Sequence, residues 1–457
     1  MAGRRSILSL LVIAMAISGC GVGPSGAGGG GSVAGDCTPD SNPADCCPGG
    51  QAPVFITLMD GSEVFDGCVA TEGLLEDGNV GGSQGKLSGE PNGSFMQALP
   101  VLYDNDNLVK LQGSVERTGD LDVFELGALQ AGDRIVVDLA GVSDYFDPSI
   151  AVFDEDFSLF MDNDDVNTAA RLYDSFIDQI VRHGGDQYYL VVGHSAFASP
   201  GWEVGNYRVT VTVEHGHEVP PPRAQIILLD FEGGLVGPDN LLVKTLPPFD
   251  AGAIDRVYEG QDEVIRAAIV ASVLENFESY DVTIVTDRAE VPLGEPYSTL
   301  MLGGHSQLAF GISEAVDHYN AEMGDVAIIF TEAFDPAKFS ATPTARELGL
   351  AIGNIAVHEA GHLLGLNHVD DANAIMDGAS PADTFLRDQN FIVGPLSSDV
   401  LPIGNQDAPL LLSEIVGLRP GFELEQPRPV PVVLRRARLK KTHPYSWCGT
   451  CNPNLAR

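Results

Sequence analysis

The segment from His358 to His368 constrains this chain more than any other, since it reads His-Glu-Ala-Gly-His-Leu-Leu-Gly-Leu-Asn-His. The pattern of residues 347–364 predicts a mostly apolar helix, and residues four apart on a helix share one face. His358 and His362 would therefore present both imidazoles to one ion. Glu359 is rotated by about 100° around the helix axis, so its carboxylate can reach a water at that ion without binding the ion.

Gly365 can adopt the left-handed conformation that ends a helix and turns the chain. Such a turn would bring His368 to the same ion from another direction. Three neutral imidazoles leave one position of a tetrahedral zinc site open, which is typical of a catalytic site. The alternative is a buried apolar helix with incidental histidines, each of which would need a polar partner. We predict one catalytic zinc ion bound by His358, His362 and His368, with Glu359 as the general base.

This segment resembles the zinc-binding signature of the metzincin metallopeptidases. Ala374-Ile375-Met376-Asp377 is similar to the Met-turn of that family, particularly of matrixins, and Met376 falls eight residues past His368. The resemblance covers about residues 223–417, and Gly404 to Asp407 onward resembles the last helix of such domains. It implies an α+β domain with a mixed sheet and an active-site helix. It also implies hydrolysis of protein or peptide substrates, which lie extended along a sheet edge.

Two features found in some metzincins are not recognisable in this sequence. Gly378 stands two residues after Met376, so no tyrosine zinc ligand of the astacin kind is expected. No inhibitory cysteine switch is recognisable in the sequence. The mechanism implied is attack of an activated water on a peptide carbonyl, with Glu359 accepting the proton and passing it to the leaving amine.

Residues 90–215 contain short alternating strands separated by Gly, Asp and Pro, which predicts an acidic all-β sandwich, jelly-roll-like. The strands expected are residues 108–111, 122–126, 134–139, 149–153, 187–192 and 207–213. The region resembles the bacterial pre-peptidase C-terminal domain, although here it precedes the peptidase. The matching residues are Gly119-Asp120-Leu-Asp122-Val-Phe124, Ala131-Gly132-Asp133, Asp147-Pro148, Asn163-Asp164-Asp165, Tyr188-Tyr189 and Gly205-Asn206-Tyr207.

Clustered carboxylates in the loops of this sandwich suit Ca²⁺, which prefers hard oxygen ligands. The candidate ligands are Asp120, Asp122, Asp147, Asp162, Asp164 and Asp165. The alternative is that these residues form turns and carry solvated charges, because Asp favours turns for local reasons. His215, His217, His305 and His318 are interpreted as incidental.

The N-terminus reads as an export signal at residues 1–19, with Arg4 and Arg5 before an apolar core at residues 7–17. Ile17-Ser-Gly-Cys20 resembles the lipobox of bacterial lipoproteins, which implies cleavage before Cys20 and lipidation of that residue. Several acyl chains on Cys20 would anchor the protein to a membrane. Gly21 resembles the outer-membrane sorting pattern. The alternative is an ordinary cleaved signal in which Cys20 is incidental.

Export places the remaining six cysteines in an oxidising compartment, where disulfides are favoured. Cys448 and Cys451 are the expected local pair, although a C-x-x-C can also be half of a zinc site or a redox dithiol. The net charge of −39 excludes a nucleic-acid binder, because phosphate neutralisation needs a basic surface.

The sequence therefore predicts a multidomain chain. Its segments are the signal peptide (1–19), a lipidated Cys with a Gly/Ser tether (20–36), a Cys-containing irregular region (37–89), the sandwich (90–215), a Pro-rich linker (216–223), a metzincin-like zinc peptidase domain (224–420) and a basic tail (421–457). The function expected is that of an exported, membrane-anchored zinc endopeptidase of the bacterial cell envelope. The alternative is a non-enzymatic surface adhesion or scaffold lipoprotein with a vestigial metal site, but such a site usually loses its general base first, and Glu359 is present.

Overall fold

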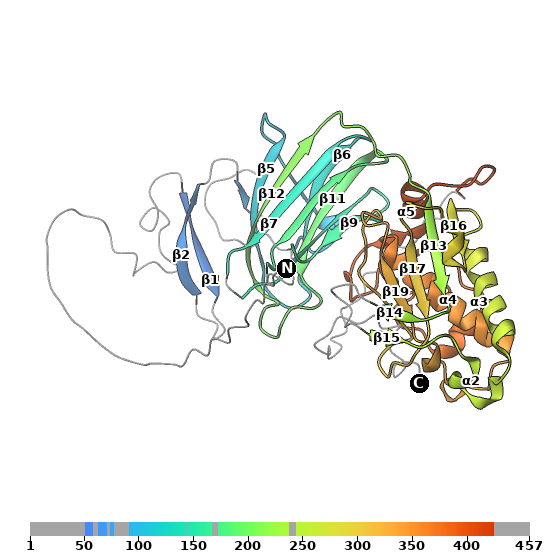
Figure 1. Cartoon of the computed structure of the whole chain (residues 1–457). Helices are drawn as coiled ribbons and strands as arrows, with labels where there is room; N and C mark the ends of the chain where they lie inside the picture. The colour runs from blue at the N-terminus through green and yellow to red at the C-terminus, as the bar shows by residue number, and fades with distance from the viewer. Residues whose placement is uncertain are drawn as a thin grey trace, which may run out of the picture.

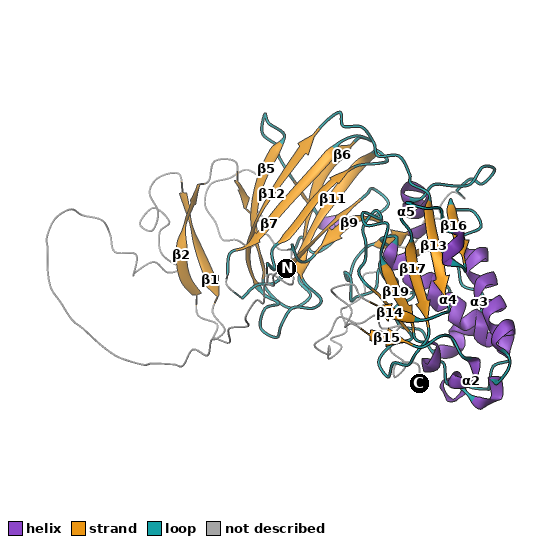
Figure 2. Ribbon diagram, viewed as in Figure 1, coloured by secondary structure: helices purple, strands orange, loops and turns teal. Residues whose placement is uncertain are grey.

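The computed structural model describes the backbone of three short strands at residues 51–57, 63–70 and 74–76, and then residues 91–143, 145–166, 172–236 and 244–424. These residues form a β-sandwich followed by an α+β domain, the two classes that the sequence predicts (Figures 1 and 2). The signal peptide, Cys20, the tether, most of the basic tail and the pair Cys448 and Cys451 lie outside the described residues.

The sandwich consists of two five-stranded sheets, one with the order β10-β7-β12-β5-β3 and the other with the order β4-β6-β11-β8-β9. The strands are β3 (Leu74–Glu76), β4 (Leu99–Pro100), β5 (Leu108–Val115), β6 (Asp122–Leu129), β7 (Arg134–Gly141), β8 (Pro148–Phe153), β9 (Leu159–Asn163), β10 (Ser175–Ile180), β11 (Gly185–His194) and β12 (Gly205–Glu214). Alternate residues of β7 are buried, because each sheet turns one face toward the other, whereas every residue of β8 is buried.

Three described segments of the region 37–89 form strands. Strands β1 (Gln51–Thr57) and β2 (Glu63–Ala70) form an antiparallel hairpin, and β3 pairs in parallel with β5. The sheet therefore begins before residue 90. A three-residue strand that pairs with a distant one has no local pattern by which sequence analysis can find it.

The second domain has one sheet with the order β16-β13-β17-β19-β18. Its strands are β13 (Gln225–Asp230), β16 (Val282–Val285), β17 (Ser298–Leu302), β18 (Gly311–Ser313) and β19 (Val326–Ile329). The first four in that order are parallel, and β18 runs antiparallel to β19, so the sheet is mixed, as expected. Strand β18 therefore forms one edge of the sheet.

Three helices and two small hairpins complete the domain, together with the single turn α2 (Ala251–Ile254). The helices are α3 (Asp262–Asn276), α4 (Ala345–Leu363) and α5 (Ala408–Ile415), and the hairpin strands are β14 (Gly234–Val236), β15 (Lys244–Leu246), β20 (Val393–Pro395) and β21 (Asn405–Asp407). Short 3-10 helices of this domain cover Arg256–Tyr258, Arg288–Glu290, Thr331–Ala333, Pro336–Lys338 and Ala382–Leu386, and one in the sandwich covers Phe95–Gln97. No helix in the described part of the chain combines the length and the apolar content that a bilayer span needs.

Helices α3 and α4 pack closely because α4 carries glycines at the contact. A Cβ on Gly349 would lie 2.5 Å from Cβ of Ala268, and one on Gly353 would lie 2.6 Å from Cβ of Ser272. Helix α3 ends at Asn276, and just beyond it the ring of Tyr280 packs on those of Phe277 and Phe391. Helix α4 in turn covers strands β17 to β19 (Figure 2).

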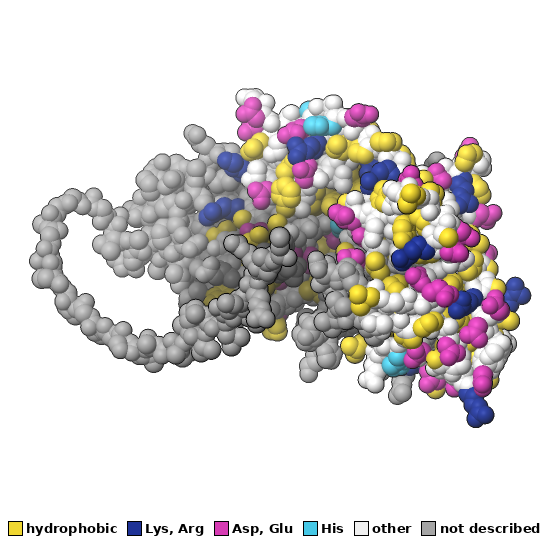
Figure 3. Space-filling model, in the orientation of Figure 1, with side chains coloured by type: hydrophobic (Ala, Val, Ile, Leu, Met, Phe, Trp, Pro, Cys, Tyr) yellow, Lys and Arg dark blue, Asp and Glu magenta, His cyan; other side chains and the backbone are white. Residues whose placement is uncertain are grey.

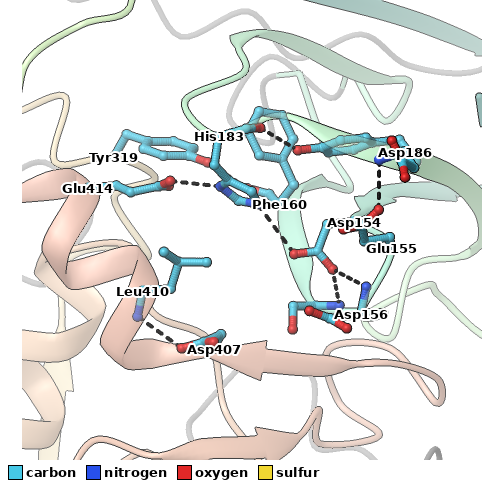
Figure 4. Close-up of polar contacts among 12 residues, drawn as sticks. Asp154, Glu155, Asp156, Phe160, His183, Asp186, Tyr319, Asp407, Leu410 and Glu414 are labelled. Atoms are coloured by element: carbon cyan, nitrogen blue, oxygen red, sulfur yellow. Dashed lines mark hydrogen bonds and ion pairs between the residues drawn. The ribbon is translucent and has the colours of Figure 1, made fainter. Parts of the chain in front are cut away.

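The two domains share an extensive interface (Figure 4). Tyr319 donates its hydroxyl to the carbonyl oxygen of Phe160 at 3.1 Å, and the guanidinium of Arg182 lies 4.6 Å from the centre of the Tyr319 ring. His183, after β10, points between Asp154 of the sandwich and Glu414 of α5. Apolar residues of both domains form one continuous core. The sandwich is therefore packed onto the α+β domain.

Candidate metal centre and active site

Helix α4 positions the first two histidines. It begins with a capping box, in which Thr344 and Glu347 each bond the other's backbone N–H, and this fixes where the helix starts. Nearly every residue of α4 from Leu348 onward is buried, because the sheet covers one face and α3 the other. His358 and His362, one turn apart, are 0% and 3% exposed. A polar pair in so apolar a helix requires a partner.

Gly365 turns the chain after α4, as predicted. Its φ is +87°, and a Cβ there would lie 2.8 Å from the carbonyl oxygen of Asp317. Only glycine is unstrained in this conformation with so little room. The turn brings His368 back toward α4, where it is 8% exposed.

The three imidazoles converge on one point. Nε2 of His362 lies 3.1 Å from Nε2 of His358 and 3.1 Å from Nε2 of His368. Two nitrogens bound to one tetrahedral zinc, each at about 2.0–2.1 Å, are about 3.3 Å apart. Within the described ranges this is the one group of three or more His, Cys, Asp or Glu side chains whose ligand atoms all lie within 4.8 Å of one another. The donor set and its spacing thus fit a zinc ion.

The Nδ1 atom of each ring also lies close to a protein oxygen. Nδ1 of His358 lies 2.8 Å from the carbonyl oxygen of Ile375, and Nδ1 of His362 lies 2.7 Å from that of Leu366. Nδ1 of His368 lies 3.1 Å from Oδ2 of Asp399. An acceptor at Nδ1 fixes the tautomer that leaves Nε2 free to bind a metal. Asp399, 31 residues from its partner, was not predicted, since no local motif marks it.

Glu359 lies beside this group, between α4 and the edge strand β18. It is fully buried, and a Cβ added to Gly311 of β18 would lie 2.5 Å from its Oε1 atom. The carboxylate is thus held at the sheet edge, on the residue of α4 that follows His358. This is the position that a general base for a water between metal and substrate would need.

Met376 lies against the helix that carries the histidines. It is 1% exposed, and a Cβ on Gly361 of α4 would lie 2.5 Å from its sulfur. The preceding carbonyl, of Ile375, is the acceptor for His358. Burial raises the pKa of Asp377, the residue after Met376. The segment after His368 is therefore packed under the metal-binding group, as a Met-turn would be.

The predicted calcium ligands do not gather at one point. Asp120 accepts from the backbone N–H of Glu116 and pairs with Arg117, while Asp122 accepts from Asn92 and from the Tyr207 hydroxyl at 2.6 Å. These contacts engage both oxygens of each carboxylate. Asp120 and Asp122 therefore stabilise the sandwich through protein contacts, and calcium binding at the six predicted aspartates stays a prediction.

Asp147 is the most unusual of the remaining aspartates. It is 6% exposed, and burial, together with the nearby charges of Asp165 and Asp164, raises its pKa to about 7. Burial and the charge of Asp165 also raise the pKa of Asp164. Asp162 points elsewhere, toward Asn367 and His318 of the second domain.

The four histidines interpreted as incidental have protein contacts. Asp133 lies 2.7 Å from His215, Glu214 lies 3.2 Å from His217, and the carbonyl oxygen of Glu332 lies 3.2 Å from His305. Asp162 lies 3.4 Å from His318. None of the four joins the metal-binding group among the described residues.

Comparison with known proteins supports the class that this site defines. Residues 307–385, which include the three histidines, Glu359 and Met376, match the model of the Matrixin family of peptidases. The second domain is thus metzincin-like, as the sequence predicts, and the match supports a zinc metallopeptidase. No curated protein matches the chain.

Several solved structures resemble parts of the chain, among them the following three. Archaemetzincin from Methanopyrus kandleri is 16% identical over 36% of this chain and 87% of its own, with a TM-score of 0.23. The pre-peptidase C-terminal domain of collagenase from Bacillus anthracis is 12% identical over 26% and 94%, with a TM-score of 0.18. PliG from Aeromonas hydrophila, a periplasmic lysozyme inhibitor, is 19% identical over 26% and 96%, with a TM-score of 0.21. At such TM-scores these three structures carry no weight for function.

Proposed function

We propose that this protein is a zinc-dependent endopeptidase, held at the bacterial cell envelope by a lipid on Cys20. The single observation that carries the enzymatic part is the convergence of three Nε2 atoms next to the buried Glu359, with Nε2 of His362 lying 3.1 Å from each of the other two. His358, His362 and His368 would hold the zinc ion. When bound, zinc lowers the pKa of a water ligand and acts as a Lewis acid toward a carbonyl oxygen.

Glu359 would transfer the proton, and strand β18 would bind the substrate. The Glu359 carboxylate accepts a proton from the attacking water and later gives it to the leaving amine, so that it is both base and acid. Its burial beside Gly311 limits its motion. A carboxylate fixed at the reacting centre saves the entropy of bringing a free base to it.

Strand β18 would bind the substrate. Among the described strands it pairs only with β19, so its outer edge has backbone groups available to an extended peptide. A peptide added there as a further strand would pass Glu359, which touches Gly311 of β18. This placement favours cleavage within a chain, since an open strand edge sets no limit at either end of the peptide.

The acidic surface is consistent with protein substrates and with the predicted absence of nucleic-acid partners. Figure 3 shows Asp and Glu side chains spread over both domains, with Lys and Arg scattered between them and no broad basic patch on the visible face. A surface of this kind repels phosphate backbones.

The test is proteolysis by the purified protein. The zinc-loaded protein should cleave casein or gelatin at internal bonds, lose activity to a chelator and regain it with zinc. Glu359→Gln should bind zinc as tightly as the wild type and lose at least about 100-fold in kcat/KM. Glu275→Gln, at an exposed site on α3, is the matched control. Full activity in Glu359→Gln would reject this mechanism.

The adhesion or scaffold alternative makes the opposite prediction, because a vestigial site would leave zinc-loaded wild-type protein inactive on every substrate. The anchor is tested separately. Cys20→Ala should release the protein from the membrane fraction and abolish incorporation of labelled fatty acid. Retention of both the label and the membrane association in that variant would refute lipidation at Cys20.

A further inference from the structure

The turn that carries His368 is bonded to the other domain of the protein. Asn367, the residue before His368, is 6% exposed, and its Nδ2 donates to Oδ1 of Asp162 at 2.8 Å. Asp162 belongs to β9 of the sandwich, 205 residues earlier in the chain. The same carboxylate oxygen lies 3.4 Å from Nε2 of His318, whose Cα packs against Gly365. The sandwich therefore contacts the turn directly.

The backbone of Asn367 is fixed from the opposite side. Its N–H donates to Oε1 of Gln406 at 2.6 Å, and Nε2 of Gln406 donates to the Asn367 carbonyl at 2.8 Å. Gln406 is fully buried in β21, and the neighbouring Asn405 N–H donates to the carbonyl oxygen of Phe157 in the sandwich at 2.9 Å. Thus the strand that clamps Asn367 is itself bonded to the sandwich.

The loop that reaches His368 also rests on the sandwich. It runs from Leu396 to Gly404, where Ser397 N–H donates to the His368 carbonyl at 3.0 Å and Asp399 faces Nδ1. Leu396, Leu401 and Ile403 are buried in one apolar cluster with sandwich residues Phe95, Leu121, Val123, Ala151, Phe153, Leu159 and Val191. Gly404 has a φ of +86°, and a Cβ there would lie 2.3 Å from the ring of Phe153.

These contacts differ from those of the first two histidines, which a single helix holds. His368 stands outside α4, in irregular backbone, so its position depends on what packs around the turn. Groups that orient a metal ligand from outside the coordination shell typically contribute 10–100-fold to metal affinity. A ligand that is already in place also spares the entropy of ordering it on binding.

From this geometry we infer that the sandwich is an integral part of the metal centre and that Asp162 is a positioning residue, which holds the third histidine in place through Asn367. The inference rests on the proposed function, since it takes the three histidines to be zinc ligands. It also gives Asp162 a role other than calcium binding. A sandwich with this role is not a removable appendage of the peptidase.

The test uses the full chain with Asp162→Ala, Asp162→Asn and the control Asp186→Ala, which removes an exposed carboxylate from β11. Zinc affinity is measured by competition with a chelator, and amide hydrogen exchange of residues 364–369 is measured without metal. We expect zinc binding of Asp162→Ala to weaken by about 10–100-fold, with faster exchange in the turn. Asp162→Asn should stay within about threefold, because its amide oxygen still accepts from Asn367. Asp186→Ala should behave as the wild type.

Asn367→Ala completes a double-mutant cycle, in which the double variant should bind zinc no more weakly than Asp162→Ala alone. Unchanged affinity and exchange in Asp162→Ala would overturn the inference, and so would an Asn variant as weak as the Ala variant. Additive losses in the cycle would also overturn it. If the wild type bound no zinc, the proposed function would fail, while the exchange of residues 364–369 would still decide whether Asp162 holds the turn.

Discussion

Nδ1 of His183, in the sandwich, lies 2.7 Å from Oε1 of Glu414, on α5 of the peptidase domain. The other ring nitrogen lies 3.4 Å from Oδ2 of Asp154 (Figure 4). A charged imidazole between two carboxylates from different domains joins them electrostatically. Hydrogen bonds to Asp154 and Glu414 outweigh burial and raise the pKa of His183 to about 10.

The first prediction concerns the pH dependence of this contact. Because the folded-state pKa exceeds the ordinary value of 6.5, the stabilisation is fully present below pH 6.5 and is lost as the pH rises through about 10. His183→Gln should lower the free energy of unfolding at pH 6 by about 1–3 kcal/mol, a range reduced because the side chain is 32% exposed. Its deficit relative to the wild type should shrink as the pH rises from 6.5 to about 10 in denaturant titrations. His217→Gln, at a surface pair, is the control, and a deficit that does not vary with pH would contradict the charge on His183.

The second prediction is a gain of stability on substitution, because Asp147 is a buried acid with a raised pKa. Its pKa of about 7 means that the folded state prefers the neutral form, so ionisation destabilises the fold progressively as the pH rises from about 4 to 7. Asp147→Asn should therefore be more stable than the wild type at pH 8, by about 1–3 kcal/mol, and equal to it near pH 3. Asp186→Asn should show no such difference. Equal stability of wild type and Asp147→Asn across this range would refute the raised pKa.

The third prediction concerns calcium binding near Asp147. If Ca²⁺ binds beside Asp147, Asp164 and Asp165, millimolar Ca²⁺ at pH 7.5 should raise the melting temperature of the wild type. Asp147→Asn should lose most of this shift, because it removes one ligand charge. A wild-type melting temperature that does not respond to Ca²⁺ would refute calcium binding at these aspartates.

A fourth prediction concerns the contact between Gly311 and Glu359. In Gly311→Ala the new Cβ would lie 2.5 Å from Oε1 and 2.7 Å from Cγ of Glu359, so the carboxylate must move. We expect kcat to fall by at least about tenfold while zinc affinity stays within about threefold, since no imidazole is touched. Gly324→Ala is the control, because a Cβ at that position meets nothing within 4 Å. Normal kcat in Gly311→Ala would mean that the position of Glu359 is not set by β18.

Much of this site could be predicted from the sequence, because its parts are local. The i, i+4 spacing of His358 and His362 predicts their shared face on a helix. Gly365 predicts the turn, since a left-handed residue at a helix end favours glycine. Met376, only eight residues past His368, follows the same local logic.

The remaining contacts are long-range, and no periodicity encodes them. Asp399 lies 31 residues from His368, and Asp162 lies 205 residues from Asn367. Asp162 reads as a calcium ligand because it stands in an Asp-rich segment, whereas its partner comes from another domain. Strand β3 shows the same limit in the fold, because three residues carry too little pattern to be assigned without the strand they pair with.

X-ray absorption at the zinc edge of the loaded full-length protein measures directly whether three imidazoles bind one zinc ion. We expect one zinc per chain with three imidazole nitrogens at about 2.0–2.1 Å and one further light-atom ligand, and one imidazole fewer in His368→Ala. A spectrum with sulfur ligands, with fewer than three imidazoles, or unchanged in His368→Ala would contradict this expectation.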